Sequence, residues 1–317
     1  MKRAATTAQC GGEHLLGQLF SIFFYLLAPV FSLVLIGYVA GPRLRIEARS
    51  PSRISYYILV PPFIFNVFKD AEIEPGLALR MTAYIVTVTV ATILVALLIA
   101  VVIRRASPPM VAAYVMLATF GNVGNFGLPI IQFRLGEEAL LAASVYFIVI
   151  LTMGFMIGVI AANWFRGGGL QAVWKAFTTP AILALFPAFV VNYFNLPVPL
   201  FVDRAVELMA GALVPVMLIT LGIQLAGMGS VRVSLDGVLA GSVRLVAGPI
   251  LAIALAAPFG LSGIERGAGI LQASMPAAVL TTLIAMEHDL IPDFVTTTVL
   301  FATLASSVTL TIVLAII

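Results

Sequence analysis

Runs of about 20 apolar residues follow one another along almost the whole chain, and this feature constrains the fold most. A helix of about 20 residues crosses the roughly 30 Å hydrocarbon layer of a membrane. The composition agrees, because 62% of the 317 residues are hydrophobic and only 10% are charged, whereas about 25% of the residues of a soluble domain are charged. The chain is therefore predicted to be an all-α membrane protein.

Counting apolar runs between charged residues and Gly or Pro predicts ten transmembrane helices. Basic residues in the connections slightly favour one side, and four of them crowd into the first connection. By the positive-inside rule this bias places both termini outside the plasma membrane. No remaining stretch is long enough for a soluble domain. The expected helices are 15–41, 53–68, 77–103, 109–134, 138–164, 176–195, 204–227, 236–258, 263–287 and 292–316.

The chain also repeats short patterns at a nearly constant distance. Leu-Val-Pro at 59–61 recurs at 213–215, an offset of 213 − 59 = 154, and Pro129 has a counterpart in Pro276, an offset of 276 − 129 = 147. These offsets predict two repeats of five helices, and an odd number of helices makes the second repeat enter the membrane inverted. The expected parts are a tail (1–14), a first repeat (15–165), a linker (166–175) and a second repeat (176–317).

The segment from Thr119 to Pro129, TFGNVGNFGLP, interrupts the fourth predicted helix. Gly and Pro weaken helical hydrogen bonding, and free backbone groups in hydrocarbon are costly, so such a break belongs in the protein interior. A broken helix exposes amide donors and the positive end of its dipole, which attract a carboxylate, and Asn122 and Asn125 add further hydrogen bonds. Alternatively, the glycines only allow close helix packing and Pro129 only kinks the helix.

The ninth predicted helix carries a matching polar break around Pro276. If the repeats are inverted, the two proline-broken helices cross near the membrane midplane and their breaks face one cavity. Alternatively, the hydroxyls of Ser274, Thr281 and Thr282 only bond back to carbonyls of their own helix. The predicted substrate-binding residues are Asn122, Asn125, Pro129, Gln272, Ser274, Pro276 and Thr281.

Arg244 and Glu207 are the ionisable residues nearest to membrane depth. A charge in the membrane is costly, which makes such residues functional candidates. Both lie within about two turns of a predicted helix end, so we expect their side chains to extend toward the membrane surface. His14 and His288 fall in a terminus and a loop, where a proton relay is not expected.

Several classes of protein are excluded by what the sequence lacks. It has no His-Glu-x-x-His pair, no Gly-x-Ser-x-Gly turn and no aspartate-rich intramembrane motif, so neither an enzyme nor a metal site is predicted. Its basic residues lie in short connections and form no stripe, which argues against nucleic-acid binding. Cys10 is the only cysteine, so no intrachain disulfide forms.

Several segments resemble the auxin efflux carrier family, which includes plant carriers and bacterial carriers of malate or malonate. The likeness implies ten helices in two inverted repeats, a scaffold domain from helices one, two, six and seven, a transport domain from the others, and a homodimer through the scaffold. Asn122, seven residues before Pro129, corresponds to an asparagine that contacts the substrate carboxylate in plant carriers. Two departures are Ala277 and Ala278, where plant carriers are more polar, and the missing long central loop. The segments are 33–41, 52–66, 121–129, 273–287 and 292–293.

The expected function is that of a secondary transporter that exports a small carboxylate by elevator-type alternating access. An inside-negative potential contributes about 2.3 kcal/mol per charge per 100 mV and drives an uncoupled anion outward. Export then needs no cofactor or ion, whereas uptake would need a coupled ion, for which sodium held by carbonyls and neutral side chains is the candidate. The alternatives are a sodium-coupled organic-anion symporter of bile-acid-transporter type and a membrane-embedded sensor. The sequence does not distinguish malate, malonate or an indole acid as substrate.

Overall fold

The structure is a computed structural model that describes residue 24 and residues 28–70, 75–163, 180–227, 234–287 and 289–317. Within these ranges every regular element is a helix or helical turn, and the β-type pairing is an isolated bridge. The elements are α2 (Ala28–Arg43), α3 (Arg49–Arg53), η2 (Ile54–Leu59), α4 (Val60–Lys69), α5 (Pro75–Leu97), η3 (Leu98–Ile103), α6 (Pro108–Thr119), η4 (Val123–Gly127), α7 (Leu128–Leu135), η5 (Glu137–Ala139), α8 (Leu140–Asn163), α10 (Pro180–Phe194), α11 (Leu200–Gly227), α12 (Leu235–Ser242), η6 (Val243–Ala247), α13 (Gly248–Ala256), α14 (Gly263–Ala273), α15 (Val279–Glu287) and α16 (Pro292–Ile316).

The prediction of an α-helical membrane protein is confirmed at the level of the fold class. In the described part of the chain, five helical segments are long and apolar enough to span a membrane: Gly76–Ile103, Glu137–Gly154, Leu200–Gly227, Leu235–Ala256 and Pro292–Ile316. Shorter apolar helices accompany them at Ala28–Arg43, Pro108–Thr119 and Ile182–Phe194. The predicted tail and linker, Cys10, both histidines and parts of the first, fifth and sixth predicted helices lie outside the described residues.

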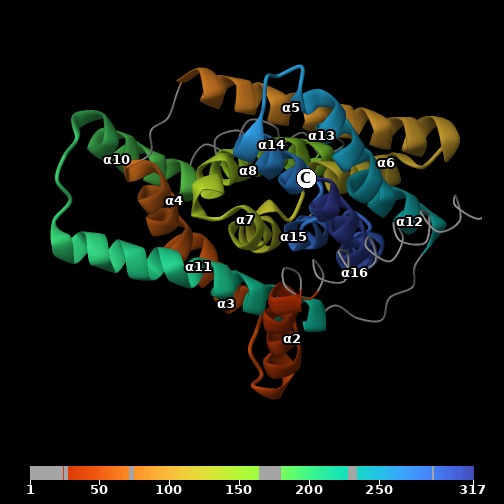
Figure 1. Cartoon of the computed structure of the whole chain (residues 1–317). Helices are drawn as coiled ribbons and strands as arrows, with labels where there is room; N and C mark the ends of the chain where they lie inside the picture. The colour runs from red at the N-terminus through yellow and green to blue at the C-terminus, as the bar shows by residue number, and fades with distance from the viewer. Residues whose placement is uncertain (1–23, 25–27, 71–74, 164–179, 228–233, 288) are drawn as a thin grey trace, which may run out of the picture.

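The helices pack into two groups (Figure 1). In the first group, α2 lies along α11, and α4 contacts both α10 and α11. In the second group, α5, α6 and α8 pack on one another, α13 and α14 join them, and α12, α15 and α16 complete the group. The two groups meet where α11 contacts η4 and where α4 contacts α8.

The first group is held by close backbone packing and by a charged pair. A Cβ at Gly37 of α2 would lie 2.0 Å from the Ile219 carbonyl oxygen, and one at Gly222 of α11 would lie 1.9 Å from the Val34 carbonyl oxygen. Only glycine permits this approach of two helices. At one end of the group, the Lys69 ammonium pairs with the Asp203 carboxylate, which joins α4 to α11.

The second group is held by polar contacts at one end of its helices. Arg104 donates from Nε and Nη2 to the two carboxylate oxygens of Asp236, at 2.8 and 3.1 Å. Tyr114 donates to the Asp236 carbonyl and carboxylate, so α6 is tied to the start of α12. Hydrogen bonding to Asp236 raises the pKa of the Arg104 guanidinium. These contacts join the end of η3, α6 and α12.

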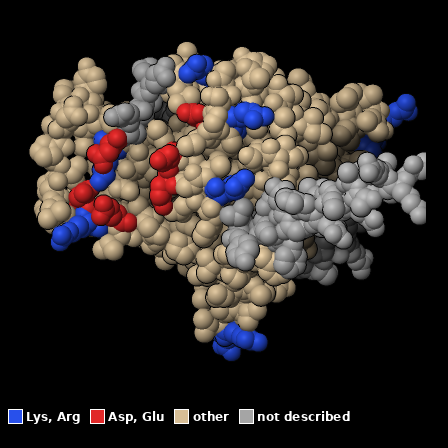
Figure 2. Space-filling model, in the orientation of Figure 1, with Lys and Arg blue, Asp and Glu red and all other residues tan. Residues whose placement is uncertain are grey.

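The outer surface is largely uncharged. Large apolar side chains such as Leu94, Val102, Phe186 and Val308 are exposed on the helices, and Figure 2 shows that few charges interrupt one broad face. Exposed apolar area of this extent would be unfavourable in water and is typical of a surface that faces lipid. The chain is therefore embedded in a membrane.

Candidate functional site

The two predicted breaks meet within the second group, where the end of α6 contacts α15. The chain turns extended after α6 and again after α14, and an antiparallel bridge joins Gly121 to Ala277. The backbone amide of Asn122 donates to the Pro276 carbonyl at 2.7 Å, and that of Ala278 donates to the Phe120 carbonyl at 2.8 Å. Each break thus satisfies two backbone groups of the other, which is how an interrupted helix is tolerated in a membrane.

The bridge defines which residues of the two breaks correspond. Its centre gives an offset of 277 − 121 = 156, close to the offset of 154 from the two Leu-Val-Pro segments. At this offset Asn122 corresponds to Ala278, and Phe120 corresponds to Pro276. This offset differs from the offset of 147 between Pro129 and Pro276.

The break in the fourth predicted helix also lies before its proline. The backbone leaves the helix at Phe120 and Gly121, whereas Pro129 occupies the first turn of α7. A wide π-helical turn, η4, runs directly into α7 and precedes Pro129, so the proline lies where the regular hydrogen bonding of the helix is already altered. The sequence had predicted that Pro129 breaks the fourth helix, and this prediction is wrong. Pro276, in contrast, lies within the second break, as predicted.

Two helix N-termini begin at the bridge. The Asn122 carbonyl accepts from the amides of Phe126 and Gly127, at 3.2 and 3.0 Å, so the helix that continues into α7 starts at Asn122. The α15 helix starts at Val279, directly after the second break. The first amides of a helix have no acceptor within that helix, and its N-terminus carries a partial positive charge. The two starts together form a place that favours negative charge.

Buried polar atoms beside the bridge have no hydrogen-bond partner among the described residues. Asn122 is 4% exposed and its Nδ2 is one such atom; Gln272 is 0% exposed and its Oε1 is another, although its Nε2 donates to the Ala143 carbonyl at 3.2 Å. The Thr282 hydroxyl is also without a partner. A buried polar group left unbonded costs about 1–3 kcal/mol, so such groups indicate a place for a ligand or water.

The remaining predicted site residues have more ordinary surroundings. Asn125 is half-buried, and Pro129 is buried within α7. The Ser274 hydroxyl donates to the Ile270 carbonyl at 2.7 Å, and the Thr281 hydroxyl donates to the Ala278 carbonyl. These two hydroxyls follow the alternative interpretation, in which they bond back to their own segment. The structure thus brings Asn122, Gln272 and Pro276 together at the bridge.

Each glycine of the motif also allows a close contact. A Cβ at Gly121 would lie 1.9 Å from Arg244 Nη2, one at Gly124 would lie 2.8 Å from the Phe147 ring, and one at Gly127 would lie 2.1 Å from Gln272 Oε1. The packing interpretation of the glycines and the broken-helix interpretation of the motif therefore hold together.

Arg244 differs from the expectation at this site. Its side chain is only 2% exposed and lies at the bridge, so it does not extend toward the membrane surface. The reason is its place in the π-helical turn η6, midway along the span Leu235–Ala256, too far from either end for a side chain to leave the membrane. Glu207 is exposed and lines the cavity described below. The place of Arg244 near the middle of the apolar run Leu235–Ala256 was the sequence signal for a position deep within a span.

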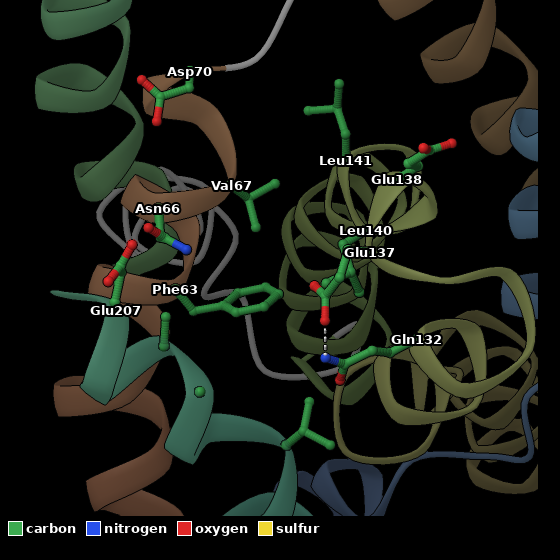
Figure 3. Close-up of a pocket in the computed structure, with 13 residues that line it drawn as sticks. Phe63, Asn66, Val67, Asp70, Gln132, Glu137, Glu138, Leu140, Leu141 and Glu207 are labelled. Atoms are coloured by element: carbon green, nitrogen blue, oxygen red, sulfur yellow. Dashed lines mark hydrogen bonds between the residues drawn. The ribbon is translucent and has the colours of Figure 1, made fainter. Parts of the chain in front are cut away.

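A cavity of about 410 Å³ lies between the two groups of helices. Figure 3 shows Phe63, Asn66, Val67 and Glu207 on one side and Gln132, Glu137 and Leu140 on the other. On this second side, the Gln132 side-chain amide donates to the Glu137 carboxylate at 2.6 Å. We call this cavity the acidic crevice, because four carboxylates line it: Asp70, Glu137, Glu138 and Glu207.

Among the described residues no group of three or more His, Cys, Asp or Glu side chains could hold a metal ion. The acidic crevice faces the space between the groups, whereas the bridge lies within the second group. The bridge therefore has the features of an anion site, whereas the crevice is lined by negative charge.

The fold class agrees with comparisons to known proteins. The chain matches the family described as membrane transport protein over residues 22–169 and 165–314. It belongs to this family, which is the auxin efflux carrier family. The resemblance noted in the sequence is thereby confirmed, and so is the class of membrane transporter.

Two archaeal relatives cover most of the chain. An uncharacterized transporter of Methanothermobacter thermautotrophicus is 25% identical over 89% of this chain and 94% of its own length. One of Methanocaldococcus jannaschii is 23% identical over 82% of this chain and 88% of its own. A rice protein named probable auxin efflux carrier component 5b is 30% identical over 43% of this chain and 39% of its own length.

Proposed function

We propose that this protein is a secondary transporter of a small organic anion and that the carboxylate of its substrate binds at the bridge between the two breaks. The observation that carries the proposal is the meeting of two helix N-termini at a buried Asn122 whose Nδ2 has no partner among the described residues. Backbone amides and a side-chain amide are the donors that a carboxylate needs. Asn125 and Gln272 complete the proposed site.

The proposed mechanism is alternating access of the elevator type. The first group of helices, α2, α4, α10 and α11, would be the scaffold and the dimer interface, and the second group would carry the bridge across the membrane. Two inverted repeats of five helices account for this arrangement. The acidic crevice supports the proposal, because it separates the groups at their contact and is lined by both.

Export is the proposed direction, with both termini outside the plasma membrane. An inside-negative potential favours outward movement of an anion without any coupled ion, at about 2.3 kcal/mol per charge per 100 mV. Plant relatives named auxin efflux carriers point the same way. A carboxylate attached to a small aromatic or aliphatic body is the proposed substrate class.

The first test is a thermal-shift screen of the purified full chain against indole-3-acetate, malate and malonate, each with sodium or with choline as the cation. A ligand that binds the folded state raises the melting temperature with its concentration. We expect at least one carboxylate to do so in choline. A shift that needs sodium would favour the sodium-coupled symporter of bile-acid type.

The second test is counterflow of the radiolabelled carboxylate in proteoliposomes. Accumulation driven by unlabelled ligand inside the vesicles is expected of a carrier. Binding without counterflow would favour a membrane-embedded sensor, and the absence of both for every carboxylate would refute the assignment of an organic-anion carrier.

A further inference from the structure

Arg244 holds the backbone of both breaks at once. Its Nε donates to the Met275 carbonyl at 3.1 Å, Nη1 donates to the Ala118 carbonyl at 3.2 Å, and Nη2 lies 3.5 Å from the Gln272 carbonyl. Ala118 belongs to the end of α6, and the other two acceptors belong to the end of α14 and the break after it. The guanidinium therefore lies at the C-terminal ends of two helices.

The charges at this point are arranged in two layers. A helix C-terminus carries a partial negative charge and unbonded carbonyls, whereas a helix N-terminus carries a partial positive charge. Arg244 neutralises the carbonyl ends of α6 and α14, and the N-termini that begin at Asn122 and Val279 lie directly beyond the bridge. The negative ends are thus covered by a cation, and the positive ends are left for an anion.

No described carboxylate balances the charge of Arg244. Its polar partners are carbonyls, and Tyr146, also fully buried, lies within electrostatic reach but makes no hydrogen bond of ordinary geometry. A buried charge without a counter-ion is strongly unfavourable. The guanidinium has five N–H donors, of which these contacts use three. An anion close to the bridge would supply the missing charge.

Carbonyl oxygens at helix C-termini are also the ligands with which broken helices of cation-coupled carriers bind a sodium ion. We propose that Arg244 takes the place of a coupling cation at the bridge, an inference that rests on the proposed function of an anion carrier. Its guanidinium binds the carbonyls that a coupling ion would otherwise bind. Its charge also makes the neighbouring site positive. The residue acts as a positioning residue, through the backbone of both breaks. Anion binding then needs no sodium.

This assignment also fixes which step senses voltage. Arg244 moves with the second group, so the group carries one positive charge when empty and none with a monocarboxylate bound. A potential of 100 mV acts on a charge that crosses the whole membrane with about 2.3 kcal/mol. The return of the empty group, and not the loaded movement, is expected to depend on voltage.

The experiment removes the guanidinium group of Arg244 by mutation and supplies free guanidinium in solution. In purified Arg244→Ala, the space beside three carbonyls is expected to bind guanidinium, so that about 10 mM guanidinium chloride raises the melting temperature saturably. The wild type and Arg104→Ala, which lacks a surface arginine of the same group, are expected to show no such rise. An equal response of all three proteins would overturn the proposal. This measurement needs no substrate, so it stands even if no carboxylate binds.

A second set of variants distinguishes the effect of the Arg244 charge from the effect of its packing. Arg244→Lys retains a cation and Arg244→Gln does not, and both are also made in case Arg244→Ala fails to fold. We expect the affinity for malonate and indole-3-acetate in choline to fall by about tenfold or more in Arg244→Gln and less in Arg244→Lys. Sodium or guanidinium is expected to restore part of the affinity of Arg244→Ala. Unchanged affinity in folded Arg244→Gln, or a wild type that binds only in sodium, would refute the role; failure of all carboxylates to bind any protein would refute the proposed function instead.

Discussion

The two breaks share a backbone but differ in side chains. Their pairing is reciprocal: Asn122 donates to Pro276, and Ala278 donates to Phe120. At equivalent positions, however, the first break has Asn122 where the second has Ala278, and the second has Pro276 where the first has Phe120. The first break also holds three close-packed glycines. The second is shaped by its proline and flanked by hydroxyls that are mostly bonded locally.

This difference indicates a division of roles between two halves of one site. The second break supplies carbonyls to Arg244 and to Asn122, so it organises the backbone. The first break supplies the buried side-chain amide, which is the group that contacts the ligand in the proposed function. Substitutions in the two breaks should therefore affect stability and affinity in different proportions.

The largest effect is expected from Gly121→Ala, which breaks the contact between the first break and the cation. The new Cβ would lie 1.9 Å from Arg244 Nη2 and 2.7 Å from Cζ. We expect a loss of stability of about 3 kcal/mol, because the guanidinium is held by both breaks and has little room to move. The melting temperature measures the loss. Gly211→Ala in α11 is the control, since nothing lies within 4 Å of its Cβ, and an equally large loss there would contradict the explanation.

The next effect is expected from Asn122→Ala, which makes the first break resemble the second. Removal of the amide should weaken carboxylate binding by about tenfold, or about 1.4 kcal/mol. Asn125→Ala, at a half-buried position one turn away, should weaken binding less. Titration of the ligand found in the thermal-shift screen measures both. Unchanged affinity in folded Asn122→Ala would remove this residue from the site.

A smaller effect is expected from the two prolines, and it tests where the chain is broken. Pro276→Ala removes the constraint that keeps Met275 from continuing α14, and we expect about a threefold loss of affinity. Pro129→Ala lies beyond the first break, after the π-helical turn η4, and should change affinity by less than about twofold. A larger loss of affinity in Pro129→Ala than in Pro276→Ala would show that the first break depends on Pro129.

The smallest effect is expected in the acidic crevice, outside both breaks. Glu138→Gln removes one of the four carboxylates, so initial uptake of malonate through this opening should rise by about twofold at low salt. The difference should vanish near 0.5 M salt because exposed charges are screened. Glu265→Gln, which does not line the crevice, is the control. A salt-independent change would show that Glu138 acts through contact and not through its charge.

Much of the architecture follows from local sequence patterns. Apolar length fixed the class, and the boundaries of the described helices follow the predicted runs within a few residues, as with 292–316 and Pro292–Ile316. The TFGNVGNFGLP motif and Pro276 located the two breaks, because glycine and proline act on the backbone where they stand. The pairing of the breaks with each other was expected from the repeat.

Only the tertiary structure showed how the two breaks pair and where the Arg244 side chain lies. The bridge set the register at 156 and moved the first break from Pro129 to Gly121. It also placed Arg244 at the ends of two distant helices, where the sequence had predicted a side chain reaching for the surface. The physical reason is that hydrophobic length is a property of one segment, whereas the satisfaction of a buried charge depends on carbonyls that three segments bring together.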